Sequence, residues 1–364
     1  MKSKNRESRM EQQVSQRKPG SRIVRYAIRG VATLFVLLFV ATCISTAWNA
    51  WARHHALKVA GIPGKLYLVN GRRMHLFCTG QGSPTIVLEA GLGDDSMIWG
   101  KVQPVLSRET RVCSYDRAGF GWSDSRQGIR DSNAISSELH GLLKESGITG
   151  PIILMGHSIA GIHMREYEAR YPEGVKGIVF LDGSTPLQDD RFPTSLRDEE
   201  KKYYEKMPWY KFLTIIGVAR VRGECSQVDP GFEEYAAWIK ADSCNPRQFT
   251  AIQAELAGIQ RSGEETARLG PFGDLPILIL SQDPDKQTEE LPPALSRQVS
   301  TIWNGMQEDI KKLSTRSRRI IAKGSTHYIQ VDRPELVNRE VANFLQVVRG
   351  QAAPSSPYGS TEKE

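Results

Sequence analysis

Strand-like apolar runs alternate with longer segments of helical spacing through most of the chain. The runs occupy residues 85–90, 111–115, 151–155, 175–181, 276–280 and 318–322. Within residues 131–147, Ile135, Leu139 and Leu142 recur at the spacing that predicts a helix. Similar patterns predict helices over residues 159–171, 293–313 and 334–348. Buried strands separated by helices predict a mostly parallel sheet with helices on both faces.

Two regions depart from this alternation. Residues 65–80 contain two strand-like runs that meet at Asn70-Gly71, a strong signal for a β-hairpin. In the second region, residues 183–272, scattered aromatic side chains lie on helical patterns, and we predict a helical lid there. The C-terminal tail, residues 351–364, is rich in Pro, Ser and Gly, a composition that predicts disorder. The predicted segments are core, lid, core and tail, at residues 65–182, 183–272, 273–350 and 351–364.

The longest apolar run lies near the start of the chain. No charged residue occurs over residues 30–52. Helical residues from Gly30 to Trp48 would cover about 28 Å, close to the thickness of a bilayer's hydrocarbon core. Trp48 and Trp51 stand where an interfacial aromatic belt is expected. We therefore predict a transmembrane signal-anchor over 30–52. A signal peptide cleaved near Ser45-Thr46-Ala47 is the alternative, although the run exceeds the usual length of such a peptide.

The net charge of the chain lies before this run. Of 48 basic and 41 acidic residues, nine basic and two acidic ones lie in residues 1–29. This tail therefore carries the whole net charge of +7, and the remaining 39 basic and 39 acidic residues cancel. A cationic flank favours a cytoplasmic N-terminus, which places the rest of the chain in the periplasm or outside the cell. Because the rest has no basic excess, nucleic acid is not an expected partner.

A nucleophile motif lies at the junction of a predicted strand and a predicted helix. The sequence Gly156-His157-Ser158-Ile159-Ala160 has the form GxSxA, with Ala160 in place of the usual second glycine. In a nucleophile elbow, the serine occupies a strained turn that exposes its hydroxyl above the sheet. The motif alone would fit a plain loop serine equally well, but the flanking strand and helix are the required context. We predict that Ser158 is a catalytic nucleophile.

Partners for this serine are expected at the carboxyl ends of later strands, where parallel sheets bind ligands. His327 follows the last predicted strand, and its place after the serine in the chain suits a general base. Three aspartates at strand ends are candidates for the acid that orients the histidine: Asp182, Asp283 and Asp285. Each could instead be a turn-forming residue, which is common at strand ends.

A glycine-rich loop follows the first buried strand. In Glu89-Ala90-Gly91-Leu92-Gly93 the glycines allow a tight turn, and we predict that the N–H groups of Leu92 and Ile159 form an oxyanion hole. A phosphate-binding loop is the rival interpretation, but no lysine follows at the required spacing. No Cys/His cluster has the spacing of metal ligands, and the predicted chemistry requires no cofactor.

Over residues 65–350 the chain resembles the α/β-hydrolase superfamily, in particular its exported serine hydrolases. Three ordered motifs carry the resemblance: Tyr115-Asp-Arg-Ala-Gly-Phe-Gly-Trp-Ser-Asp124, Gly156-His-Ser-Ile-Ala-Gly161 and Gly324-Ser-Thr-His-Tyr-Ile-Gln-Val-Asp-Arg-Pro-Glu335. The resemblance implies an α/β fold with a mostly parallel eight-stranded sheet and an inserted lid. It also implies that His157 supports the turn. The family's spacing from Pro276 implies Asp285 as the acid; Gln282 replaces the usual glycine there, so Asp283 and Asp182 stay alternatives.

Four cysteines lie outside the predicted membrane segment, and an exported location favours their oxidation. In the strand order that the resemblance implies, Cys78 and Cys113 lie on neighbouring strands, within disulfide reach. Cys225 and Cys244 both fall in the predicted lid. We predict the bonds Cys78–Cys113 and Cys225–Cys244, and four free buried thiols are the alternative.

Together these residues predict hydrolysis of an ester, or of an amide or thioester, through an acyl-enzyme. A serine rather than an aspartate at the elbow argues against epoxide hydrolase and haloalkane dehalogenase chemistry. Acyl transfer and C–C bond hydrolysis use the same triad and are alternatives, as is a non-catalytic binding protein of the same fold. The expected partners are a small molecule with an apolar acyl group and the membrane, through the N-terminal helix.

Overall fold

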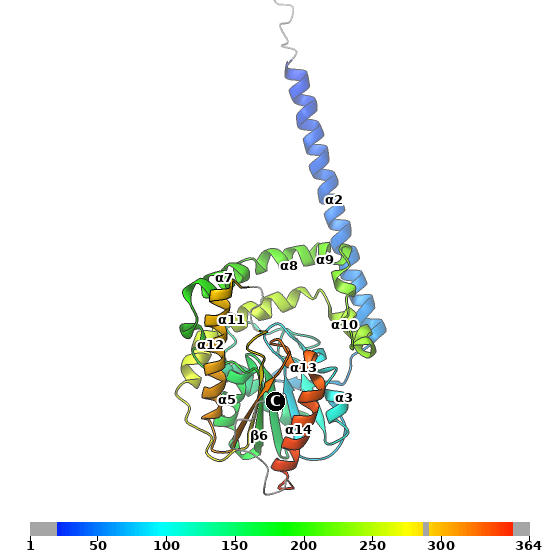
Figure 1. Cartoon of the computed structure of the whole chain (residues 1–364). Coiled ribbons are helices and arrows are strands. Elements are labelled where there is room, and N and C mark those ends of the chain that lie inside the picture. Colours follow the sequence, from blue (N-terminus) through cyan, green and yellow to red (C-terminus); the bar gives the residue numbers. More distant parts are fainter. Residues whose placement is uncertain (1–19, 287–290, 352–364) are drawn as a thin grey trace, which may run out of the picture.

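A single eight-stranded sheet forms the centre of the molecule in this computed structural model, which describes residues 20–286 and 291–351 (Figure 1). The strand order is β1-β2-β4-β3-β5-β6-β7-β8. Only β2 runs antiparallel to its neighbours, β1 and β4, so the predicted mostly parallel sheet is confirmed. The strands are β1 Lys65–Val69, β2 Arg72–Thr79, β3 Thr85–Glu89, β4 Val112–Tyr115, β5 Ile152–His157, β6 Val175–Leu181, β7 Ile277–Gln282 and β8 Ser317–Ala322.

Helices cover both faces of the sheet (Figure 1). One face packs Leu139, Leu142 and Met164 against the strands, and the other packs Trp99 and Phe344. Every residue of β3, β5 and β7 is buried, which explains why these strands read as unbroken apolar runs. The covering helices include α3 Gln103–Leu106, α4 Ser132–Glu145, α5 Ala160–Arg170, α12 Pro293–Lys311, α13 Ile329–Asp332 and α14 Pro334–Val348, with the 3₁₀ turns Ser96–Trp99 and Pro172–Gly174.

The segment predicted as a lid, residues 183–272, is helical between β6 and β7. Its longest helix, α11, begins at the cap residue Asn245, whose side chain accepts a hydrogen bond from the N–H of Arg247. Helices α7, α8 and α11 lie together at the end of the core from which α2 projects (Figure 1). The helices are α6 Gln188–Arg191, α7 Thr194–Glu205, α8 Met207–Ile215, α9 Val218–Val221, α10 Ala236–Asp242 and α11 Pro246–Thr266, with 3₁₀ turns at Glu224–Ser226 and Glu233–Tyr235.

The N-terminal helix α2 spans Gly20–Ala60 and projects away from the rest of the molecule (Figure 1). It is longer than the predicted segment 30–52, because the helix continues through the polar residues on both sides. Within the described residues, it is the one helix long and apolar enough to cross a membrane. Most of the predicted basic tail and nearly all of the predicted disordered tail lie outside the described residues.

Both predicted disulfides are present. Cys78 and Cys113 are register partners on β2 and β4, with Cα atoms 4.0 Å apart. Cys225 and Cys244 bridge two lid segments, with Cα atoms 5.4 Å apart. The first bond depends on the strand order, which brings together two strands that are separated in sequence by β3.

Candidate active site

Ser158 occupies a tight turn between β5 and α5. Its φ of +57° lies in the left-handed region, which non-glycine residues rarely adopt. Main-chain hydrogen bonds hold this conformation: the Ser158 N–H donates to Leu181 O at 3.1 Å, and the Ser184 N–H donates to Ser158 O at 2.8 Å. The turn therefore has the geometry expected of a nucleophile elbow.

Small residues around Ser158 are required by close approach. A Cβ on Gly156 would lie 2.6 Å from the Ala160 Cβ, and one on Gly161 would lie 2.7 Å from Ser184 O. Ala160 itself is fully buried and fits without displacing the turn. The departure from GxSxG at this position thus leaves the elbow intact.

A cavity of about 1270 Å³ brings together the predicted site residues. Ser158, His327, Leu92 and Ile159 all line it, although they come from three separate loops: the turn after β5, the loop after β8 and the loop after β3. Lid side chains, including Phe192, form another part of the wall. The cavity therefore lies between the core and the predicted lid.

The acidic partner of His327 is Asp182, at the carboxyl end of β6. The His327 Nδ1 and Asp182 Oδ2 atoms are 2.6 Å apart. The other carboxylate oxygen accepts hydrogen bonds from the Gln282 N–H at 3.0 Å and the Trp303 Nε1–H at 2.9 Å. Asp182 is fully buried, and these donors replace the water it loses.

The structure corrects the preference for Asp285. That residue is exposed, and its N–H donates to Asp283 Oδ1 at 3.1 Å. Asp283 in turn accepts from the Gly324 N–H at 2.8 Å, so it is the turn-forming aspartate that strand ends commonly carry. The family spacing on β7 led to the wrong residue, because here the loop after β6 supplies the carboxylate.

Leu92 and Ile159, the residues whose N–H groups are predicted to form an oxyanion hole, line the same cavity as Ser158. In the part of the chain that the structure describes, neither the Leu92 nor the Ile159 N–H donates to another protein group. Ile159 precedes the first turn of α5, where main-chain N–H groups and the helix dipole favour negative charge. Both N–H groups are thus free of protein acceptors among the described residues, and they stay the predicted oxyanion donors.

His157 supports the loop that carries His327. Its Nε2 lies 2.9 Å from the His327 carbonyl oxygen, and its side chain is buried. Burial, and then the proximity of His327, lowers the pKa of His157. A neutral ring that donates to this carbonyl fixes the loop carrying the catalytic candidate His327.

Arg117 holds the glycine-rich loop in place. It is buried, and its guanidinium donates to the carbonyl oxygens of Ala90 and Gly91. Glu255 of α11 accepts two further hydrogen bonds from Arg117, at 2.9 and 3.1 Å. A bidentate pair of this kind is rigid, so a residue of the predicted lid helps to set the position of the glycine-rich loop.

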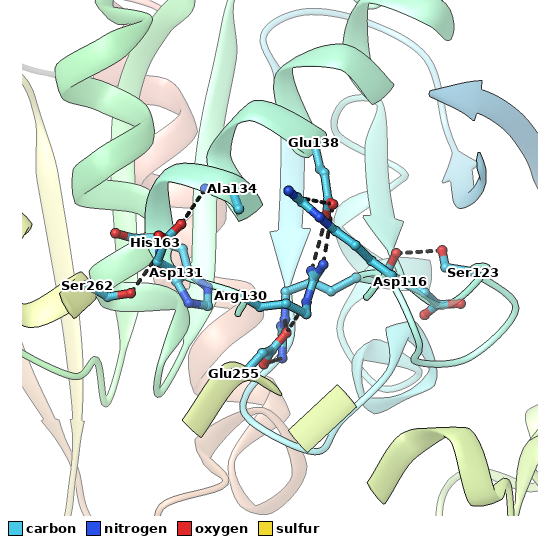
Figure 2. A network of polar contacts seen from close by, with 12 residues as sticks. Asp116, Ser123, Arg130, Asp131, Ala134, Glu138, His163, Glu255 and Ser262 are labelled. Carbon is cyan, nitrogen blue, oxygen red and sulfur yellow. Dashed lines mark hydrogen bonds and ion pairs between the residues drawn. The ribbon is translucent and has the colours of Figure 1, made fainter. Parts of the chain in front are cut away.

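The surrounding ion pairs connect the lid to the core (Figure 2). Arg130 lies between Glu255 and Glu138, with its closest oxygen on Glu138 at 3.0 Å. His163 of α5 lies 2.6 Å from Glu89, the residue that ends β3. Sequence reasoning missed this network. The sequence does show charged residues within the Tyr115–Asp124 motif and in the neighbouring helices. Which of them form pairs depends on tertiary contacts, and the sequence does not show those contacts.

Asp116 explains why the Tyr115–Asp124 motif has its form. Its carboxylate accepts hydrogen bonds from the Ser96 N–H at 2.7 Å and the Trp122 N–H at 3.0 Å. It also lies 2.8 Å from His75 Nδ1. Gly121 has a φ of +47°, and a Cβ there would collide with the Asp116 carboxylate. The motif is thus a structural turn next to the cavity rather than part of its lining.

No group of metal-ligating side chains occurs within the described residues.

Comparisons with known proteins place the chain in a family. The alpha/beta hydrolase fold family matches residues 84–334, and the chain belongs to that family. It is 26% identical over 308 residues to the uncharacterized protein YbdG of Bacillus subtilis, covering 79% of this chain and 86% of YbdG. A shorter match, 31% over 105 residues, is to the putative carbamate hydrolase RutD of Cronobacter sakazakii, covering 28% of this chain and 38% of RutD.

A solved structure shares the fold. A thermophilic esterase from Thermogutta terrifontis superposes with a TM-score of 0.56 at 20% identity, covering 78% of this chain and 98% of the esterase. At that identity the likeness establishes the fold alone. The particular reaction must be argued from the site.

Proposed function

We propose that this protein is a serine hydrolase that cleaves an ester, or an amide or thioester, through an acyl-enzyme. The observation that carries the proposal is the His327–Asp182 pair, 2.6 Å apart, in the same cavity as Ser158 on its left-handed turn. A nucleophile, a base and a buried orienting acid are the three parts that this chemistry requires.

In the proposed reaction, Ser158 Oγ attacks the carbonyl carbon while His327 Nε2 takes the hydroxyl proton. The Leu92 and Ile159 N–H groups bind the resulting oxyanion. The tetrahedral intermediate expels the alcohol, which receives the proton from His327, and leaves the acyl group on Ser158. Water then repeats the sequence: His327 takes its proton, the acid is released and Ser158 Oγ regains the proton. Asp182 keeps the Nδ1–H of His327 in place throughout.

The lining of the cavity supports an apolar acyl group as substrate. Lid and core contribute Phe192, Leu196, Leu256 and Trp303 to its wall.

We further propose that α2 anchors the protein in a membrane with residues 1–29 in the cytoplasm, so that the hydrolase region is extracytoplasmic. The uncharged run over residues 30–52 and the cationic tail before it support this placement.

The test is the variant Ser158→Ala. We expect loss of fluorophosphonate labelling and of p-nitrophenyl ester hydrolysis, with a fall in turnover of up to about 10⁶. Ser184→Ala is the matched control, because this serine lines the same cavity but touches the elbow only through its main chain. Labelling that persists in Ser158→Ala would refute the assignment of the nucleophile.

A further inference from the structure

The lid helix α8 presents an apolar outer face. Trp209, Phe212 and Ile215 recur every three residues and are 58%, 45% and 38% exposed, and Val221 in α9 is 73% exposed. We call these four side chains the lid ridge. The opposite side of α8 is buried at Met207 and Thr214 and packs on α11. The ridge therefore faces away from the hydrolase core.

Direct contacts fix the ridge beside the anchor helix. Ser45 Oγ donates to Ile216 O at 2.6 Å. Asn49 Nδ2 donates to Thr214 O at 2.8 Å, and its Oδ1 accepts from Arg220 Nε at 2.7 Å. Figure 1 shows α8 extending sideways from α2, which continues beyond it away from the core. The end of α8 thus meets α2 at residues 45–49.

That level is near the end of the uncharged run of α2, which stops at Ala52. Counting from Arg29, the last charge before the run, residue 49 lies about 30 Å along the helix, one hydrocarbon thickness away. With α2 as the proposed anchor, residues 45–49 therefore lie near the interface between hydrocarbon and headgroups. A helix that leaves α2 sideways at this level lies along the bilayer surface.

The charge of the ridge segment matches the same surface. Residues 206–222 contain four basic side chains and no acidic one; Glu205 and Glu224 border this stretch, and Glu224 lies 3.5 Å from Arg222. Lys206 and Arg222 are exposed on the flanks of the ridge. Apolar side chains with flanking cations are the pattern of helices that lie in the membrane interface, where lipid phosphates attract the cations.

We propose that the lid ridge is seated in the headgroup region of the bilayer that α2 spans, and that the enzyme takes its acyl substrate from that bilayer. The inference rests on the proposed anchoring and hydrolase function and adds the partner of the lid. Helix α7 lines the cavity through Leu196 and Tyr204 and joins α8 at Lys206. The wall of the cavity is therefore attached to the membrane-seated helix, and an amphiphilic ester in the same leaflet lies next to it.

The contact is tested with spin labels on the full chain in phospholipid vesicles. Cys43 is replaced by serine, which leaves the two disulfides and no free cysteine. Single cysteines are then placed at Phe212 in the ridge, at Phe39 in the anchor, and at Val105, which is 39% exposed on α3 of the core. Collision of each label with oxygen, which partitions into lipid, is compared with collision with a water-soluble nickel chelate.

We expect labels at 39 and 212 to favour oxygen and the label at 105 to favour the nickel chelate. The proposal would be overturned if the label at 212 were as accessible to the nickel chelate as the label at 105. If the label at 39 still favoured oxygen, the anchor would be left intact. Low access of both reagents at 212 would mean that protein, such as a second copy, covers the ridge, and would also overturn it. A label at 39 that favours nickel would refute the anchor itself.

The substrate part has its own measurement. The triple variant Trp209→Ser, Phe212→Ser, Ile215→Ser should lower kcat/KM about tenfold for a long-chain ester dissolved in the vesicles. Its kcat/KM for a short water-soluble ester should stay within twofold, and Val105→Ser should change neither. Equal loss on both esters, or loss on neither, would overturn the claim that substrate comes from the bilayer. Failure of the hydrolase function would be separate, since wild type would then cleave neither.

Discussion

At the residue scale, the carboxylate of Asp182 has three donors. His327, Gln282 and Trp303 surround it, and it is shielded from water. Such a carboxylate can hold the imidazole in one tautomer and stabilise the positive charge that forms on it during the reaction. Asp285, in contrast, is exposed and has no part in this arrangement.

Replacement of these two aspartates distinguishes their roles. Asp182→Asn should lower turnover by up to about 10⁴, because the amide favours the wrong imidazole tautomer. Asp285→Asn should leave turnover within twofold of wild type. Steady-state kinetics with a p-nitrophenyl ester measure both, and a crippled Asp285→Asn beside a mild Asp182→Asn would reverse the assignment.

Gly91 offers a second test at this scale. A Cβ there would lie 2.7 Å from His157 Nδ1 and 3.0 Å from Asp94 Oδ2. His157 is buried and cannot move away freely, so Gly91→Ala should displace the loop that carries the Leu92 N–H. Loss of one oxyanion donor lowers kcat by about 10²–10³.

The control for this change is Gly150→Ala. No atom lies within 4 Å of the Cβ it would add, so kcat should not change. An unaltered kcat in Gly91→Ala would show that the loop does not supply an oxyanion donor.

At the element scale, α10 ends in a buried carboxylate. Asp242 lies 3.8 Å from Arg53 of α2 and accepts a hydrogen bond from Asn245 at 3.0 Å. Burial, and then the nearby charge of Asp116, raises the pKa of Asp242 to about 7. The junction of lid and anchor helix thus contains an acid that titrates near neutrality.

This shift makes stability depend on pH. Below about pH 4 the carboxyl is protonated in both the folded and the unfolded chain, and its contribution is fully present. As pH rises toward 7 the unfolded chain releases the proton first, so stability is lost until the folded pKa is passed. We therefore expect the melting temperature to fall between pH 5 and 8, by about 2–4 °C for each kcal/mol lost.

Asp242→Asn should flatten this decline, because the amide does not titrate. Asp229→Asn, at an exposed lid position, should leave it as in wild type. Thermal unfolding of the full chain in detergent at pH 5 and 8 measures both. An equally steep decline in Asp242→Asn and wild type would assign the pH dependence to other groups.

At the scale of the whole molecule, anchor, lid and core are linked in series. Helix α2 contacts α8 and α10, Glu255 of α11 pairs with Arg117, and Arg117 holds the glycine-rich loop that follows β3. Removal of α2 would therefore leave the Thr214 and Ile216 carbonyl oxygens of the lid without their donors Asn49 and Ser45. A displacement of α2 is thus expected to displace the lid helices that it contacts.

Orientation is tested at this scale. Because the cationic tail should stay in the cytoplasm, a protease added outside spheroplasts should digest the hydrolase region and spare a tag at the N-terminus. The tag should become sensitive only after lysis. Digestion of the tag in intact spheroplasts, with the hydrolase region protected, would mean the opposite orientation.

The sequence alone determined the features that depend on local pattern. The hairpin at Asn70-Gly71 and the elbow at Ser158 follow from residues adjacent in the chain, since turn geometry and strand or helix periodicity are local properties. The strand order implied by family motifs was enough to pair Cys78 with Cys113.

Only the tertiary structure decided which aspartate meets His327. Strands β6 and β7 are neighbours in the sheet and both end in aspartates at the same edge, so the chain offers equivalent candidates. Asp182 is selected by tertiary contacts. Its backbone adopts a left-handed φ of +46° at the end of β6, and its carboxylate accepts hydrogen bonds from Gln282 of β7 and Trp303 of α12. The Arg117 network and the contact of α2 with the lid likewise join residues more than 100 positions apart, and such pairings depend on the packing of helices against one another rather than on any pattern along the chain.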